Sequence, residues 1–388
     1  MRSYTGACLN NSSKCPSIET FSENAGREWG RLDRTGEHKD RRRRTLWAMI
    51  TLLIAAATIR AVLSAGGDLS PAKLLGAVSK ASPLWLCASF LCMAGFILLE
   101  GAALQCILRH LGYPGGFVQG LRYSAADQFF SAITPSATGG QPAAALLMHA
   151  DGVSAGAVTA TLTLNLVLYT AATLTIGILC LLGMPGVFLQ MDAPAKLLIL
   201  LGLTVLLILT LLFLGLLKRG DLLARWGKKL FQFLHRRRLI RDTARWNERL
   251  AHLAEEYAQC ARAMAGKPGV WLAVYALDLA QRIAQISVTL MFHFALSGGP
   301  ETHGAALWVT QALAQVGSNC VPLPGGMGAA DYLMLQGFRN LFTAEYAVEL
   351  QLLSRGVSYY ICTLLSGLIV LAGIPAARFR KRKRKARC

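Results

Sequence analysis

Long apolar runs recur along this chain, and they decide what it can fold into. Of its 388 residues 54% are hydrophobic, its mean hydropathy is +0.42, and several runs of about 20 residues are long enough to cross a bilayer. Because lipid offers the backbone no hydrogen bonds, a spanning segment must satisfy them internally, as a helix does. We therefore predict an all-α integral membrane protein. Its six predicted full spans are about Leu46 to Ser64, Leu84 to Leu108, Val153 to Leu182, Lys196 to Leu217, Val270 to Leu296 and Ala347 to Ala377.

Two further hydrophobic stretches are interrupted by Gly/Pro clusters at corresponding places in the two halves of the chain. The clusters are Thr134-Pro-Ser-Ala-Thr-Gly-Gly-Gln-Pro142 and Pro322-Leu-Pro-Gly-Gly-Met-Gly-Ala-Ala-Asp331. Non-helical backbone survives at membrane depth only where it is buried in protein or lines a cavity. Broken hydrophobic segments in matching positions are a sequence pointer to a transport site, so the pair indicates a membrane transporter.

Basic residues give the chain a formal net charge of +19 and collect in three places beside the apolar runs. These places are Arg27 to Arg44, Lys218 to Arg249 and Arg378 to Arg387. Segments rich in Lys and Arg next to spans stay in the cytoplasm and attract anionic lipid, so this charge indicates topology rather than nucleic-acid binding. We predict a multi-pass protein of the cytoplasmic membrane with both termini in the cytoplasm.

The charge pattern divides the chain into a disordered basic tail (1–44), a first membrane half (45–217), a cytoplasmic loop of basic amphipathic helices (218–269), a second membrane half (270–377) and a basic tail (378–388). An even number of crossings must separate each cytoplasmic segment from the next. Four predicted full spans precede the loop and two follow it, so neither interrupted segment adds a net crossing. We predict two re-entrant helical hairpins, about 117–150 and 305–338, that enter from opposite sides in an inverted-like arrangement.

The cysteines and glycines give no sign of a cofactor. Ten cysteines are scattered without a C-x-x-C pair or a Cys/His cluster at metal-ligand spacing, so we expect no metal site. The chain lacks the G-x-x-x-x-G-K-[S/T] phosphate loop, and Gly326-x-Gly328 follows no predicted strand and is an incomplete dinucleotide fingerprint. We expect no cofactor and no ATPase within the chain.

The first interrupted segment has the chemistry of a head-group site. Gly139 and Gly140 let the backbone approach a phosphate or carboxylate closely, near the electropositive start of the returning helix. Polar and turn-forming residues surround these glycines, namely Thr134, Pro135, Ser136, Thr138 and Gln141. We assign Gly325, Gly326 and Gly328 the same part in the second segment. The alternative is that each cluster forms only a tight turn.

Ionisable residues inside the predicted membrane segments are candidates for substrate contact, because a charge at the bilayer centre costs a few kcal/mol on insertion scales. Asp278 and Arg282 stand four residues apart and can pair on one helix face, either as structural glue or as part of a site. Glu100 and Asp127 could contact a cationic head group. Alternatively, either could pair with an arginine, for which Arg122 and Arg355 are candidates.

These motifs resemble the two signatures of the lysylphosphatidylglycerol synthase transmembrane, or flippase-like, family. The first is the segment Asp127 to Gly156 with its T-P-S-A-T-G-G-Q-P core, and the second is Pro322 to Asp331 followed by Arg355 and Tyr359-Tyr360. The resemblance covers about 46–377. It implies that Asp331, which stands where the family often has Glu, belongs to the site together with Arg355 and Tyr359.

Long members of this family, the multiple peptide resistance factors, carry a soluble synthase domain after the membrane domain, which we do not expect in this chain. The resemblance therefore implies movement of a lipid between leaflets, with an anionic phospholipid as the expected partner. One alternative is a membrane enzyme with Glu100, Asp127 or Asp331 as general base. Another is a scaffold for a partner lipid synthase. The sequence leaves open whether the protein forms homo-oligomers.

Overall fold

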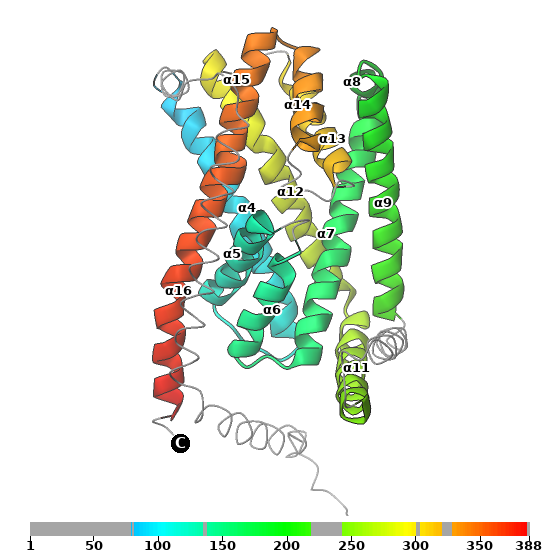
Figure 1. Cartoon of the computed structure of the whole chain (residues 1–388), viewed down its shortest axis with the longest axis vertical. Helices are drawn as coiled ribbons and strands as arrows, with labels where there is room; N and C mark the ends of the chain where they lie inside the picture. Colours follow the sequence, from blue (N-terminus) through cyan, green and yellow to red (C-terminus); the bar gives the residue numbers. More distant parts are fainter. Residues whose placement is uncertain are drawn as a thin grey trace, which may run out of the picture. The chain divides into compact units, whose positions relative to one another are not determined.

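The computed structural model describes residues 79, 81–134, 138–218, 243–299, 303–319 and 328–385, all within the unit that comprises residues 66–388. These residues form helices, and no strand occurs among them (Figure 1). The fold is all-α, as the sequence predicts. The predicted span Leu46 to Ser64, the tail 1–44, most of the basic part of the cytoplasmic loop, and the candidate site residues Pro135, Ser136, Gly325 and Gly326 lie outside the described residues.

Four helices of the described part are long and apolar enough to cross a membrane. Three of them are α4 (Pro83–His110), α7 (Ala155–Gly183) and α9 (Ala193–Lys218). The fourth is a continuous helix made of α15 (Ala344–Arg355), the π-helical segment η3 (Gly356–Ile361) and α16 (Cys362–Lys385). All four coincide with predicted spans, so the apolar runs were read correctly by length.

The fifth predicted span of the described part is α12 (Pro268–Ser297), which is 30 residues long. It is not among the four apolar candidates, because it carries Asp278, Gln281, Arg282 and Gln285 near its middle. Helix α12 packs along α4, and the amide of Ser82 donates to the carbonyl of Ala295 at 2.8 Å. The two helices therefore run antiparallel, and the polar residues Asp278, Gln281 and Arg282 of α12 are buried.

The two interrupted segments form helix pairs. The first pair is α5 (Phe117–Ile133) with α6 (Gly140–Ala150), and the second is α13 (Gly304–Ser318) with α14 (Ala329–Arg339). Their lengths of 17, 11, 15 and 11 residues all fall short of the ~20 residues that cross a bilayer.

The pairs open toward opposite ends of the helix bundle (Figure 1). At one end, α6 leads directly into α7, and the amide of Val153 donates to the carbonyl of Met148 at 3.1 Å. At the other end, the side chain of Asn340, just after α14, donates to the carbonyl of Gln190 at 3.1 Å. Gln190 follows α8 (Pro185–Leu189), which connects α7 to α9. Each pair thus joins its neighbouring helix at one end of the bundle, and the two ends differ.

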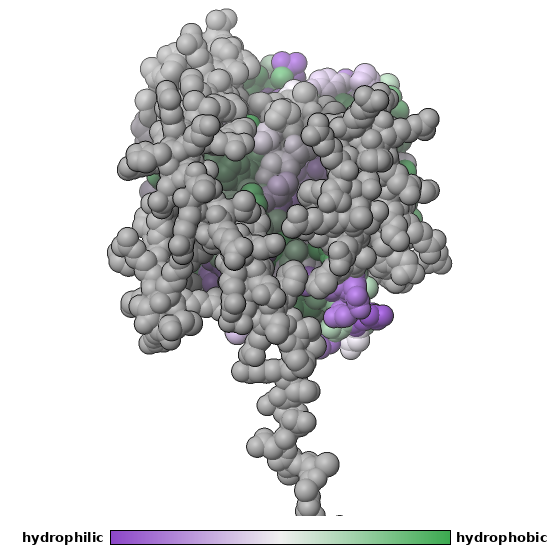
Figure 2. Space-filling model, turned by 60° about the horizontal axis from the view of Figure 1, so that its bottom comes forward, coloured by the Kyte–Doolittle hydropathy of each residue, from purple (hydrophilic) through white to green (hydrophobic). Residues whose placement is uncertain are grey.

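Helix α11 (Thr243–Ala265) lies beside the start of α7, where Oε2 of Glu256 accepts from the amide of Gly156 at 3.0 Å. Its buried face includes Tyr257 and Met264, which the sequence places on the apolar face of a helix. Figure 2 turns this end of the bundle toward the viewer and shows hydrophilic residues gathered on the side where α11 lies. This helix is amphipathic, as predicted for the loop.

Candidate functional site

A stripe of buried polar side chains runs along α12. Its members are Asp278, Gln281, Arg282, Thr289 and His293, each at most 2% exposed. Their successive spacings of three, one, seven and four residues place them within one face of a helix. We call these five residues the α12 stripe. In lipid or in an apolar core such groups are expensive to bury without partners, so their contacts show what the bundle interior is built to hold.

Glu100 of α4 lies opposite the stripe and accepts hydrogen bonds from two other helices. Its Oε2 accepts from Nε2 of Gln128 at 2.7 Å, from Oγ of Ser124 at 3.0 Å and from Nε2 of Gln281 at 3.3 Å. Gln128 and Ser124 belong to α5, whereas Gln281 belongs to α12. The Glu100 carboxyl therefore ties the first helix pair to the stripe.

Asp127 of α5 lies between Ser124 and Gln128, the two residues of that helix that donate to Glu100. The Asp127 carboxyl accepts from Oγ of Ser131 at 3.2 Å and from Nε2 of Gln141 at 3.3 Å. Gln141 is on α6, so Asp127 connects the two helices of the pair. The structure thus brings together three of the predicted site residues, Glu100, Asp127 and Gln141.

The prediction that Asp278 and Arg282 pair with each other is wrong. A guanidinium nitrogen of Arg282 donates to Oε1 of Gln285 at 2.7 Å, and the guanidinium lies 4.1 Å from the ring centre of Tyr169. The two carboxyl oxygens of Asp278 are buried, and neither has a hydrogen-bond partner among the described residues. The flat guanidinium finds a better partner in the tyrosine ring, because a cation stacks favourably on an aromatic face.

Neither of the arginines suggested for Glu100 and Asp127 pairs with them. Arg122 lies on α5 and forms an ion pair at 3.4 Å with Asp151, whose carboxylate also accepts from the Tyr123 hydroxyl at 2.8 Å. Helical periodicity turns Arg122 away from Asp127, because five residues along a helix correspond to about 500°, or 140° of net rotation. Arg355 pairs elsewhere, as described below.

The turn of the first pair is held by Thr134 and by close helix packing. Oγ1 of Thr134 accepts from the amide of Gly139 at 2.9 Å and donates to the carbonyl of Phe130 at 2.6 Å. A Cβ on Gly139 would lie 2.6 Å from the Thr134 methyl carbon, and one on Gly140 would lie 2.0 Å from Oδ1 of Asp127. Both glycines therefore serve the packing of α5 on α6. Thr138 is exposed beside them, and a role of these residues in head-group binding stays a prediction.

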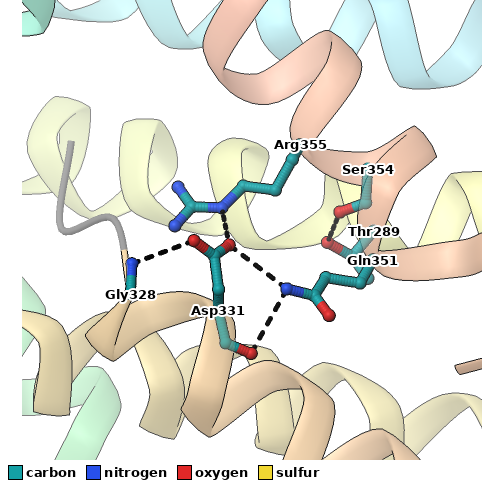
Figure 3. Close-up of polar contacts among 6 residues, drawn as sticks. All are labelled: Thr289, Gly328, Asp331, Gln351, Ser354 and Arg355. Carbon is teal, nitrogen blue, oxygen red and sulfur yellow. Dashed lines mark hydrogen bonds and ion pairs between the residues drawn. The ribbon is translucent and has the colours of Figure 1, made fainter. Parts of the chain in front are cut away.

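Figure 3 shows the second motif, in which the Asp331 carboxylate lies between three donors. Nε of Arg355 donates to its Oδ1 at 2.7 Å, and Nε2 of Gln351 donates to the same oxygen at 3.2 Å. Its Oδ2 accepts from the amide of Gly328 at 3.0 Å, which caps α14. Gly328 has φ +82°, a left-handed conformation that favours glycine.

The neighbouring Tyr332 places α14 beside the start of α9. Its hydroxyl donates to the Asp192 carboxylate at 2.5 Å, and this hydrogen bond raises the pKa of Tyr332 to about 12. Asp331 and Arg355, predicted separately as substrate contacts, are thus partners of each other in a network that joins α14 to α15.

Tyr359 links the last helix to the first motif. Its hydroxyl donates to the carbonyl of Ala132, near the end of α5, at 2.7 Å. Arg355, one turn earlier, contacts the second motif, so η3 stands between the two helix pairs. Single π-helical turns inside α-helices occur frequently at functional sites.

Sequence reasoning missed several polar members of the interior. Gln281 bonds to Glu100, the hydroxyls of Thr289 and Ser354 are hydrogen-bonded at 2.7 Å, and Nδ1 of His293 lies 2.8 Å from the Tyr346 hydroxyl. The polar residues of α12 recur at helical spacing in the sequence, and that periodicity would have identified the stripe.

An open cavity of about 770 Å³ lies at the end of the α12 stripe, where the second helix pair opens. Its lining includes His293, Ser297, His303, Arg339 and Tyr346. The cavity thus joins the last residue of the stripe to cationic and hydroxyl groups at the surface. Among the described residues, no group of His, Cys, Asp and Glu side chains is arranged to hold a metal ion.

Four apolar spans, two short helix pairs and a buried polar stripe define a polytopic helical membrane protein. The family described as Lysylphosphatidylglycerol synthase TM region matches residues 46–366, and the chain belongs to this family. The resemblance seen in the two motifs is therefore confirmed, and family membership implies a role in the membrane that concerns lipids. A search of curated proteins finds no match.

Proposed function

We propose that this protein is a lipid translocase that moves the polar head group of a phospholipid between the leaflets of the cytoplasmic membrane, without an ATPase of its own. The observation that carries the proposal is the α12 stripe, five buried polar side chains on one face of a helix of the bundle. A head group needs polar partners along its way, whereas its acyl chains can stay in lipid.

The two helix pairs have the features expected of re-entrant hairpins. Each helix is too short to span, and the two pairs open toward opposite ends of the bundle. With the termini and α11 in the cytoplasm, the α5/α6 hairpin enters from the cytoplasm and the α13/α14 hairpin enters from outside. Hairpins of this kind line binding sites near the bilayer midplane in transporters.

The cavity beside α14 is the proposed outer entrance for the head group. Arg339, His293 and His303 supply cationic or hydrogen-bonding groups that suit the phosphate of an anionic phospholipid. From there the head group would follow the α12 stripe past Thr289 toward Gln281. The contacts of Tyr359 with Ala132 and of Arg355 with Asp331 hold the two hairpins to the last helix, so these contacts must change for passage.

Lipid movement in vesicles tests the proposal. Purified protein is reconstituted in vesicles of phosphatidylethanolamine and phosphatidylglycerol with a trace of NBD-labelled phosphatidylglycerol, and dithionite quenching reports the outer-leaflet fraction. We expect wild-type protein to speed exchange and Gln281→Leu, which removes the bond to Glu100, to slow it about tenfold, corresponding to about 1.4 kcal/mol in the barrier.

The matched control is Thr204→Val, which removes a polar group from the exposed face of α9 and should leave exchange unchanged. Exchange equal to that of empty vesicles would overturn the proposal. Equal rates for wild type and Gln281→Leu would remove the stripe from the pathway. Mass spectrometry of the lipid after the assay separates transport, which leaves the head group intact, from an enzyme that modifies it.

A further inference from the structure

The buried pair Glu100 and Asp127 has a chemical property that head-group binding does not explain. Both side chains are buried, at 4% and 8% exposure, and the Glu100 carboxyl accepts from Ser124 and Gln128, which flank Asp127 on α5. A buried ionised carboxylate without a cationic partner is costly, and two neighbouring ones repel each other, so a bound proton stabilises the pair.

Among the described residues, the hydrogen-bond partners of the two carboxyl groups include no cation. Those of Glu100 are the neutral side chains of Ser124, Gln128 and Gln281, and those of Asp127 are Ser131 and Gln141. Four other ionisable groups on helices packed nearby interact electrostatically with the pair or with one another. They are Tyr169 of α7, Asp278 and Arg282 of α12, and Cys362 of α16. Arg282 is engaged with Gln285 and Tyr169, and the third carboxyl group, Asp278, adds to the excess of acid.

The two carboxyl groups belong to different helices. Glu100 is on α4, which packs along α12, whereas Asp127 is on α5 and is tied to α6 by Gln141. A movement of the α5/α6 pair relative to α4 would therefore change the distance between the two carboxyl groups, and each would then bind its proton in a different environment.

We infer that Glu100 and Asp127 form a proton-binding site that couples proton transfer to movement of the α5/α6 hairpin, which deepens the proposed translocase function and rests on it. In the loaded state both carboxyl groups carry a proton and the pair is neutral. Release of one proton to the aqueous phase on one side leaves the shared-proton pair with one negative charge. A proton taken up from the other side restores neutrality, so one turn of the cycle carries one proton across.

Infrared difference spectra of the purified protein test proton binding without any transport. The carbonyl stretch of protonated carboxyl groups is recorded while the buffer pH is stepped. We expect Glu100→Gln and Asp127→Asn each to remove a pH-sensitive band present in wild type, whereas Glu255→Gln, at an exposed site on α11, keeps it. Asp127→Glu, which retains a carboxyl group, shows a shifted band. A band unchanged in both amide variants would overturn the proton site.

Vesicles of phosphatidylethanolamine and phosphatidylglycerol, with NBD-labelled phosphatidylglycerol and an entrapped pH dye, test the coupling. We expect one pH unit to shift the steady-state leaflet ratio by up to about tenfold for one proton per lipid, and Glu100→Gln to lose this response together with the proton flux. If the wild-type protein moves lipid but the leaflet ratio does not respond to the pH gradient, the coupling is overturned and the proposed translocase function is retained. No lipid movement in wild type, with the infrared band assigned to the pair, overturns translocase and coupling and leaves only the proton site.

Discussion

Individual residues of the two motifs are fixed by contacts between helices. Gly140 illustrates this, because a Cβ there would meet Oδ1 of Asp127 at 2.0 Å, Oγ of Ser131 at 2.1 Å and the backbone oxygen of Asp127 at 2.5 Å. The flexible side chains could move aside, but the backbone oxygen could not without shifting α5 from α6. The requirement for glycine at this position thus follows from packing alone, whether or not a head group also approaches.

Gly140→Ala should therefore lower stability and lipid movement together. We expect a loss of about 1 to 3 kcal/mol, the usual effect of overpacking. Thermal unfolding and the vesicle exchange assay measure the two effects. Gly183→Ala is the control, since a Cβ there meets nothing within 4 Å. Loss of exchange with unchanged melting would contradict the packing account and favour a direct contact with the head group.

The residue-level prediction from sequence found ionisable groups but not their partners. Burial at membrane depth singled out Glu100, Asp127 and Arg355, since apolar runs make charged residues conspicuous. Which of them meet depends on how α4, α5, α14 and α15 pack, and those contacts join residues 24 or more positions apart. Sequence periodicity carries no information about such pairs, so the Asp331–Arg355 pair and the Glu100–Asp127 pair could not be predicted.

At the level of elements, hydropathy predicted the four long apolar helices of the described part, and the two interrupted segments each contain two short helices. Hydropathy could not show that the last span contains η3, because the π-helical turn is fixed by contacts with other helices. Tyr359 makes one of these contacts with Ala132, and Arg355 makes another with Asp331. The last span thus holds both helix pairs through side chains one turn apart.

Tyr359→Phe should speed lipid movement, because it removes one of the bonds that keep the first helix pair in place. A hydrogen bond contributes about 1 kcal/mol, which corresponds to about fivefold in rate if the bond breaks before passage. The vesicle exchange assay measures this. Tyr275→Phe serves as control, since its hydroxyl bonds to Thr175 of α7, away from both pairs, at 2.9 Å. Slower exchange in Tyr359→Phe would show that the bond belongs to the conducting state instead.

For the whole molecule, the opposite openings of the helix pairs make a topological prediction. In a cysteine-free background, Thr138→Cys should react with a membrane-impermeant thiol reagent from the cytoplasm, and Ala329→Cys from outside. Gly266→Cys and Gly183→Cys mark the two aqueous sides, because both positions are exposed: Gly266 lies in the turn before α12, and Gly183 is the last residue of α7. Labelling of both test positions from the same side would contradict the inverted arrangement.

The π-helical segment in the last helix has a consequence for register. A turn that closes between residues five apart holds one residue more than an α-helical turn, and each residue of an α-helix corresponds to about 100° of rotation. Conversion of residues 356–361 to regular α-helix would rotate Tyr359 away from Ala132 while Arg355 kept its place beside Asp331. The extra residue of η3 lets Arg355 contact the second motif and Tyr359 contact the first from the same helix. A change from π-helical to α-helical geometry there would release the Tyr359 contact with one hairpin and leave the Arg355 contact with the other in place.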